Sequence, residues 1–247
     1  MKLKLLLDPL KYDGKAVDWQ DWQKKFVDFE PTRNSWFYKL RKNYQHFSNN
    51  GKDVVFIDSV KTCPSFMNSF KNRIIIRNIA DLHIGNSNGT IQFRSSHPFG
   101  EAKHINFHKS SQLGNEFPFQ TGMFKDPVKF LSPFLFCFSE TVDVIINPVW
   151  WDKSNEIVQA IPGIVRIPKN DPIEFNINTF VKQPEKNTSY VIEVGTPLCQ
   201  VLITEVKKPK VFFVKSLNKK IINKRLNDIY QNLATQVSLR IKRYLIR

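Results

Sequence analysis

Short apolar runs separated by turn-forming residues dominate the chain between residues 53 and 214. The runs are four to nine residues long, with Pro, Gly, Asn or Asp between them at turn-like intervals. The segments predicted to be strands are residues 53–60, 73–79, 90–94, 103–108, 130–138, 141–147, 156–160, 163–167, 173–179, 189–193, 198–205 and 211–214. Because long helical patterns do not alternate with them, the series predicts a mainly β fold, a sandwich or a barrel.

Two further elements are predicted before this series. Residues 1–7 have a basic start and an apolar run that Asp8 and Pro9 interrupt, which predicts a strand and no signal peptide. Apolar residues at helical spacing follow, at Val17, Trp19, Trp22, Phe26 and Phe29. They predict an N-terminal helix over residues 18–30, which Pro31 ends.

Positive charge is concentrated at the C-terminal end of the chain. The protein has 37 Lys and Arg against 22 Asp and Glu, a net charge of +15. Residues 207–247 hold twelve of the basic residues and one acid, so the first 206 residues carry a net charge of only +4. We therefore divide the chain into a β-rich body, residues 1–206, and a basic segment, residues 207–247.

Apolar residues at spacings of three and four predict a long amphipathic helix in the basic segment. Cations near its end offset the helix dipole, but those near its start do not. Since phosphate neutralisation by Lys and Arg drives sequence-independent binding, the early cations predict contact with nucleic acid. They are Lys207, Lys208, Lys210, Lys215, Lys219, Lys220, Lys224 and Arg225. Two alternatives are a solvated face of a helix that docks on the body or on another subunit, and a helix on a membrane surface.

Several blocks of sequence resemble, in order, an uncharacterised protein family encoded by tailed phages of marine bacteria. The first block is KTCPSFMNSF at residues 61–70, preceded by Trp36 and Phe37. The later blocks are FLSP at 130–133, INP at 146–148, IPGIV at 161–165 and GTPLCQV at 195–201. The resemblance covers residues 36–204. It implies a phage origin and carries no assigned activity.

Two of these blocks also resemble a degenerate form of the trimeric dUTPase β-clip. In that family a Gly-Val-Ile-Asp turn carries the catalytic aspartate, and a later Gly-Asp-Arg-Ile-Ala-Gln strand closes the fold. Here GIVR at residues 163–166 and GTPLCQ at 195–200 follow in the same order. Arg166 stands where the water-activating carboxylate would be, and NPV at 147–149 does not supply the Pro-Arg-Ser phosphate grip. The resemblance implies a β-clip-like fold that does not hydrolyse dUTP.

A group of histidines is the remaining candidate for chemistry. His97, Glu101, His104 and His108 lie within twelve residues, and imidazoles with a carboxylate can ligate zinc or iron(II). The oxygenase pattern of His-x-Asp or His-x-Glu is not met, because Asn106 stands at the second position. The alternation of polar His104, Asn106 and His108 with Ile105 and Phe107 equally predicts the wet and dry faces of one strand.

Two groups of aromatic residues predict subunit contacts. If Trp150 and Trp151 lie in an alternating strand, one of them points away from the core, which favours an interface over a stacking platform for bases or sugars. Residues 113–125 form a glycine-bearing loop that is too apolar to be freely solvated. We expect three of its side chains to dock on a neighbouring subunit: Phe117, Phe119 and Phe124.

The cysteines and the length of the apolar runs indicate where in the cell the protein is expected. Cys63, Cys137 and Cys199 form no CxxC pair, which predicts three buried thiols in a reducing cytoplasm. No apolar run is long enough to span a membrane, so we expect the protein in the host cytoplasm or the virion.

Together these patterns favour a non-enzymatic phage protein, virion-associated or accessory, that is oligomeric and needs no cofactor. Its expected partners are nucleic acid, further copies of itself or other virion proteins, and no membrane. The alternative is a metal-dependent, oxygenase-like or nucleotide-processing enzyme centred on His97, His104 and His108.

Overall fold

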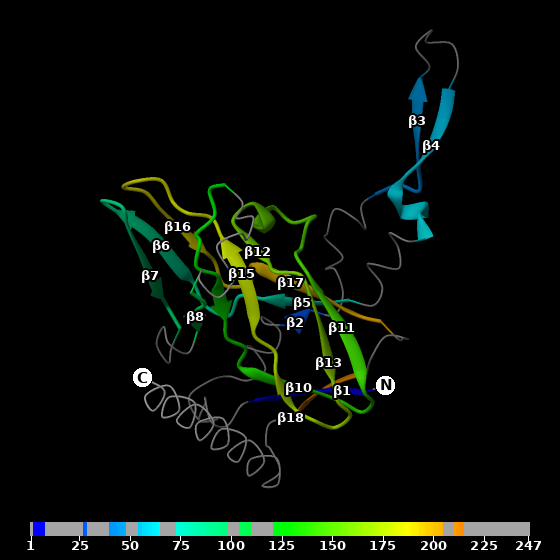
Figure 1. Cartoon of the computed structure of the whole chain (residues 1–247). Helices are drawn as coiled ribbons and strands as arrows, with labels where there is room; N and C mark the ends of the chain where they lie inside the picture. Colours follow the sequence, from blue (N-terminus) through cyan, green and yellow to red (C-terminus); the bar gives the residue numbers. More distant parts are fainter. Residues whose placement is uncertain are drawn as a thin grey trace, which may run out of the picture.

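A computed structural model describes residues 2–7, 27–28, 40–47, 54–64, 73–97, 104–109, 121–204 and 210–214. Within these ranges the regular structure consists of strands in five sheets and two short 3-10 helices, η1 (Val60–Thr62) and η4 (Lys153–Glu156). Four of the sheets form the body, and the fifth is a two-stranded ribbon that stands away from it (Figure 1). No helix in the described part is long and apolar enough to cross a membrane.

The largest sheet has five antiparallel strands in the order β13-β11-β17-β5-β2. These strands are β13 (Gly163–Ile167), β11 (Val142–Asn147), β17 (Pro197–Ile203), β5 (Arg73–Arg77) and β2 (Val27–Asp28). Apolar side chains of β5, β11 and β17 alternate toward the core, from Ile74, Ile76, Val144 and Val201. The register between β17 and β5 shifts between Pro197 and Cys199, where β17 carries an irregularity.

A second sheet joins the two ends of the described chain. Its order is β14 (Ile173–Glu174), β10 (Phe134–Phe138), β1 (Lys2–Leu7) and β18 (Lys210–Val214). β1 runs antiparallel to β10 and parallel to β18. All five residues of β10 are buried, which matches a strand that is apolar on both faces. Because β18 pairs with β1, part of the basic segment belongs to a sheet of the body.

The other two body sheets are smaller. One has the order β12 (Val158–Ala160), β15 (Ile177–Val181), β9 (Val128–Phe130) and β8 (Ile105–Phe107), and the other β16 (Ser189–Ile192), β6 (Leu82–Ser87) and β7 (Thr90–Ser95). A two-residue turn at Asn88 and Gly89 joins β6 to β7, and both residues have positive φ. Asn-Gly is the preferred pair for such a turn, and Asn86 Oδ1 accepts a hydrogen bond from Gly89 N.

All four body sheets contribute to one hydrophobic core. Its largest fully buried side chains include Phe134, Phe136 and Phe138 of β10. The ring centroids of Phe136 and Phe175 lie 4.7 Å apart. β10, with three phenylalanines, is thus buried on both of its faces.

The fifth sheet is the β3–β4 ribbon, formed by β3 (Asn43–Phe47) and β4 (Val54–Asp58). Hydrogen bonds close its base: Ser59 Oγ donates to Arg41 O at 2.6 Å, and Lys61 Nζ donates to Leu40 O at 3.1 Å. Every described side chain of both strands is exposed. The ribbon therefore stands as a separate arm, which Figure 1 shows pointing away from the body.

The prediction of a mainly β fold is confirmed, with differences in detail. Three strands were not predicted, β2, β3 and β6, and the run at 173–179 is divided between β14 and β15. The run at 130–138 is divided into β9 and β10 by Ser132, whose Oγ donates to Phe134 O and accepts from Phe134 N. The predicted helix over residues 18–30 is wrong at Val27 and Asp28, which form β2. Pairing with β5 overrides the local helical spacing there.

Other predictions fall on residues that the structure does not describe. The rest of the predicted N-terminal helix lies outside the described residues, as does the long C-terminal helix after Val214. The three cysteines are free thiols, but only Cys137 and Cys199 are buried. The prediction of a buried Cys63 is wrong, because Cys63 lies exposed just after η1 at the base of the ribbon.

Truncating Phe136 to Ala tests the central place of β10. We expect the free energy of unfolding to fall by about 3–5 kcal/mol, because a buried aromatic ring is replaced by a cavity. Urea denaturation followed by circular dichroism measures it. Ile164→Ala is the matched control, since Ile164 is 73% exposed and should change stability by less than about 0.5 kcal/mol. Equal effects of the two changes would contradict this assignment of the core.

Candidate functional site

His104 lies at the centre of a buried hydrogen-bond network. Its Nε2 is 2.6 Å from Asn78 Oδ1, and its Nδ1 is 2.6 Å from Ser95 Oγ on β7. Asn78 Nδ2 donates to the carbonyl oxygens of Ala80 and Ile192, so Oδ1 is the acceptor of that amide. His104 therefore donates from Nε2 and accepts at Nδ1 from the Ser95 hydroxyl. Both ring nitrogens are occupied by neutral protein partners.

The buried position of His104 keeps its ring uncharged. Burial is the main reason why its pKa is lowered to about 3, and the nearby charge of His97 lowers it further, while Asp81 acts in the opposite direction. His97 is also buried, and its pKa is lowered to about 4 by the loss of hydration. The two rings stack with centroids 5.7 Å apart. Near neutral pH both imidazoles are therefore uncharged, and they pack together as part of the protein interior.

The other members of the predicted metal set lie elsewhere. His108 follows β8, and its Nε2 lies 3.2 Å from Asn178 Oδ1 on β15. Glu101 lies outside the described residues. Among the residues that are described, no three His, Cys, Asp or Glu side chains come together in a way that could hold a metal ion. The structure brings His97 and His104 together, with the ring nitrogens of His104 already bound.

The alternation predicted along residues 104–108 is not observed as a clean wet and dry face. His104 and Ile105 are both buried, while Asn106 and Phe107 are both exposed. His104 precedes β8 and turns into the network, so the strand periodicity does not include it. Phe107 lies against Phe93 of β7, with ring centroids 4.9 Å apart.

Trp150 and Trp151, the pair predicted at an interface, contact each other, and Trp151 also contacts Arg73. The guanidinium of buried Arg73 lies 4.1 Å from the centroid of the Trp151 ring, and Trp150 meets Trp151 edge-on at 5.3 Å. Trp150 is 53% exposed, which is unusual for so large an apolar side chain. Both tryptophans lie in the turn that follows β11, not in an alternating strand, so strand alternation does not explain the exposure of Trp150.

Phe124, predicted to dock on a neighbouring subunit, packs against residues of its own chain. Its ring lies 5.5 Å from Phe93 between centroids, and it packs against the hydrophobic core. Its apolar character is therefore accounted for without a neighbouring subunit. Phe117 and Phe119 lie outside the described residues.

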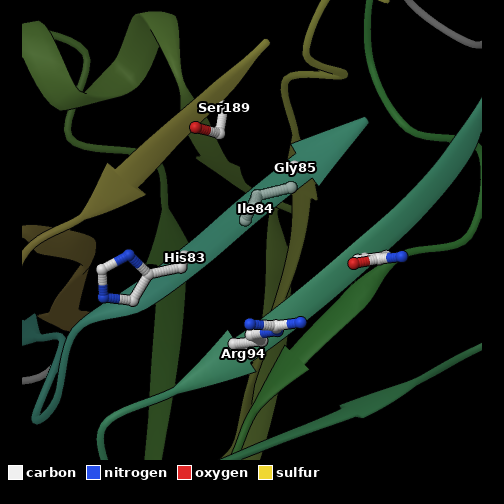
Figure 2. A pocket seen from close by; sticks show the side chains of 6 residues that line it. His83, Ile84, Gly85, Arg94 and Ser189 are labelled. Carbon is white, nitrogen blue, oxygen red and sulfur yellow. The ribbon is translucent and has the colours of Figure 1, made fainter. Parts of the chain in front are cut away.

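The outer face of the sheet formed by β16, β6 and β7 is hollowed and carries several hydrogen-bond donors. Leu82, Ile84 and Asn86 of β6 are buried, so the residues between them face outward. A shallow depression of about 490 Å³ crosses this face. Six residues line it: His83, Ile84, Gly85, Gln92, Arg94 and Ser189. Figure 2 looks into it, with His83 on β6, Arg94 on the neighbouring β7 and Ser189 on β16.

The register of the three strands explains the hollow. His83 pairs with Arg94 across β6 and β7, while Gly85 pairs with Gln92 on one side and with Ser189 on the other. Ser189, Gly85 and Gln92 thus form one row across the three strands. Because Gly85 has no side chain, the sheet surface is lower at the middle of this row than on either side. A Cβ there would lie 3.7 Å from Ser189 Cβ, an ordinary contact, so a side chain could fill the depression without strain.

The chemistry of the depression favours an anion. Four of its lining side chains, those of His83, Gln92, Arg94 and Ser189, can donate hydrogen bonds, and the six lining residues include no carboxylate. Arg94 carries a permanent positive charge on a planar fork that suits phosphate oxygens. We call this feature the β6–β7 depression.

The cations predicted to bind nucleic acid are not placed relative to this depression. Lys210 begins β18, but its side chain is not described. The other seven, Lys207, Lys208, Lys215, Lys219, Lys220, Lys224 and Arg225, lie outside the described residues.

The chain matches no protein-family model, and no curated protein matches it in sequence.

The β6–β7 depression was not predicted from the sequence, because β6 was not predicted as a strand. The signal was present: Leu82, Ile84 and Asn86 alternate with His83 and Gly85, and the turn pair Asn88-Gly89 follows. That pattern is typical of a two-stranded hairpin with one polar face.

The neutral histidines predict a pH-dependent stability. In the folded chain the pKa values of His97 and His104 lie at about 4 and 3, below the ordinary value of 6.5. At pH values between these lowered pKa values and 6.5, the unfolded chain binds more protons than the folded chain. The free energy of unfolding should therefore be greatest above pH 6.5 and fall by up to about 1.4 kcal/mol per pH unit for each histidine as the pH drops toward 4.

Urea denaturation at pH 7.5, 6 and 5 measures this dependence. His104→Gln keeps one donor and one acceptor but cannot be protonated, so its stability should fall less steeply with pH than that of the unmodified protein. His83→Gln, on the exposed face, should keep the original slope. An unchanged slope in His104→Gln would show that His104 is not buried in its neutral form.

Proposed function

We propose that this is a non-enzymatic phage protein, virion-associated or accessory, that binds nucleic acid. One observation carries the proposal: the β6–β7 depression presents four donor side chains, one of them Arg94, and no carboxylate. Phosphate oxygens are acceptors with negative charge, and they match this set of groups. The net charge of +15 supports the same class of partner.

The basic segment supplies a second contact in this proposal. Its cations, Lys207 to Arg225, bind phosphates along the strand through charge alone, while the β6–β7 depression holds one phosphate or sugar in a fixed position. In this arrangement the affinity is independent of base sequence and falls with salt.

The finer fold assignment belongs to the same proposal. We infer a sandwich or β-clip-like body with a basic amphipathic C-terminal helix. The support is the pairing of β13 and β17 on either side of β11, since these two strands contain the blocks that resemble the dUTPase β-clip. Arg166, at the position of the expected aspartate, lies 3.8 Å from Asp143 on the neighbouring strand and is exposed. An arginine cannot activate water as that aspartate does, so the proposal includes no hydrolysis.

A salt titration tests the proposal. The full chain should bind a labelled single-stranded or duplex DNA, and its affinity should fall steeply between about 50 and 200 mM salt. Neutralising the basic segment by changing Lys219, Lys220, Lys224 and Arg225 to Gln should weaken binding and reduce the salt slope. These changes keep β18, whereas ending the chain at Val206 would remove a strand that pairs with β1.

Arg94→Gln tests the depression itself. We expect a weaker complex and a salt slope lower by about one, because one phosphate contact is lost. Arg166→Gln is the matched control, as Arg166 is 74% exposed on another sheet and should leave binding unchanged. The proposal fails if the full chain does not bind at low salt, or if Arg94→Gln and Arg166→Gln have the same effect.

A further inference from the structure

The β3–β4 ribbon exposes apolar side chains on both of its faces. Five of them are between 43% and 62% exposed: Tyr44, Phe47, Val54, Phe56 and Ile57. Directly opposite residues share a face, so Tyr44 lies beside Ile57, and Phe47 lies beside Val54. A two-stranded ribbon is marginally stable alone in water and normally needs a third strand or a packed face. The ribbon thus has the composition of a buried element in an exposed position.

The outer edge of β4 is suited to pairing with another strand. Within the described part of the chain, β4 pairs only with β3. Proteins usually protect such an edge with Lys, Pro or a bulge, because its free N–H and C=O groups can pair with another strand. β4 has the sequence Val-Val-Phe-Ile-Asp, with no Lys, Pro or bulge, and its one charged residue, Asp58, stands at its C-terminal end. β3 is the more polar of the two edges, with Asn43, Gln45 and His46.

We propose that two copies of this chain associate through β4, which pairs antiparallel with β4 of the second copy about a twofold axis at Phe56. The result is a four-stranded sheet in the order β3-β4-β4-β3. This inference does not depend on nucleic-acid binding.

Charge favours a second copy of the chain as the occupant of this edge. With the axis at Phe56, the two Phe56 rings lie opposite each other, Val55 lies opposite Ile57, and Val54 lies opposite Asp58. The only charged residue of β4, Asp58, falls at opposite ends of the paired strands, so the two carboxylates are kept apart. The strand is therefore self-complementary, as a twofold interface requires.

The contacts of this arrangement lie along the seam between the two β4 strands. Pairing at that edge satisfies backbone N–H and C=O groups of both copies and brings apolar side chains of β4 into cross-strand contact, while Tyr44 and Phe47 of β3 stay outside the seam. The paired Phe56 rings would lie at its centre, where aromatic residues contribute most to binding.

Sedimentation equilibrium of the full chain over about 1–100 µM tests the association. We expect a monomer–dimer equilibrium, and Phe56→Lys should raise the dissociation constant at least about 100-fold, because it places two cations opposite each other at the axis. Ile164→Lys is the matched control, since Ile164 is an exposed apolar strand residue on the body. Circular dichroism should show both variants folded, as neither side chain is buried.

Cross-linking tests the twofold arrangement. In a Cys63→Ser background, which removes the exposed native thiol, Phe56→Cys should be joined efficiently by a short bismaleimide. Gln45→Cys pairs with Phe56 within one ribbon, but lies three strand spacings, about 14 Å, from its counterpart in the four-stranded sheet and should react poorly.

Three results would overturn the proposal. The first is a protein that stays monomeric over the whole concentration range. The second is a dimer that Phe56→Lys leaves intact. The third is a dimer that Phe56→Lys dissociates but in which Phe56→Cys cross-links no better than Gln45→Cys, because the ribbon would then contact the second copy in another way.

Discussion

The buried side chain of Asn78 connects parts of the body that are far apart in the sequence. Its nitrogen donates to Ala80 O and Ile192 O, and its oxygen accepts from His104. Its backbone N–H donates to Thr196 O, and its carbonyl accepts from Gly195 N. Because each unsatisfied buried polar group costs about 1–3 kcal/mol, the end of β5, the end of β16 and the start of β8 can meet in few other ways.

This network holds the β16-β6-β7 sheet against the rest of the body. His104 reaches Ser95 at the end of β7, and Asn78 reaches the end of β16, so both edge strands of that sheet are attached at the same place. The outer face of the sheet is then free to carry polar residues, since its inner face supplies Leu82 and Ile84 to the core. The β6–β7 depression is thus a surface feature supported by a buried polar connection. The histidines that resemble a metal set in sequence are part of that support.

Two exposed surfaces of opposite chemistry characterise the molecule. The β6–β7 depression offers four donor side chains, whereas the β3–β4 ribbon exposes apolar side chains on both faces. An apolar ribbon gains free energy by excluding water against another protein surface, while a set of donors with one fixed cation favours an anion. A protein that joins copies through one surface and binds nucleic acid through the other is consistent with both.

The sequence predicted most of the strands but only part of the candidate site. Apolar runs such as those of β10 and β17 are strands because burial on both faces leaves no polar alternation to confuse them with a surface helix. β6 was missed because Gly85 and Asn86 weaken the apolar pattern of a strand whose stability comes from pairing with β7 and β16. The helix predicted over residues 18–30 is wrong at Val27 and Asp28 for a related reason, as hydrogen bonds to β5 decide their conformation. Spacing along the chain could place His97 near His104 but could not reveal Asn78, whose contact with His104 spans 26 residues.

The sequence by itself determined the mainly β character and the uneven distribution of charge, because each depends on composition or on short periodicity. Only the tertiary structure decided which polar residues are buried together and which apolar residues are left outside. The pairing of Gly85 with Gln92 and Ser189, and the exposure of Phe47 and Phe56, follow from strand register and from the position of the ribbon away from the core. These are long-range contacts, and their free energy depends on neighbours that no local window of sequence contains.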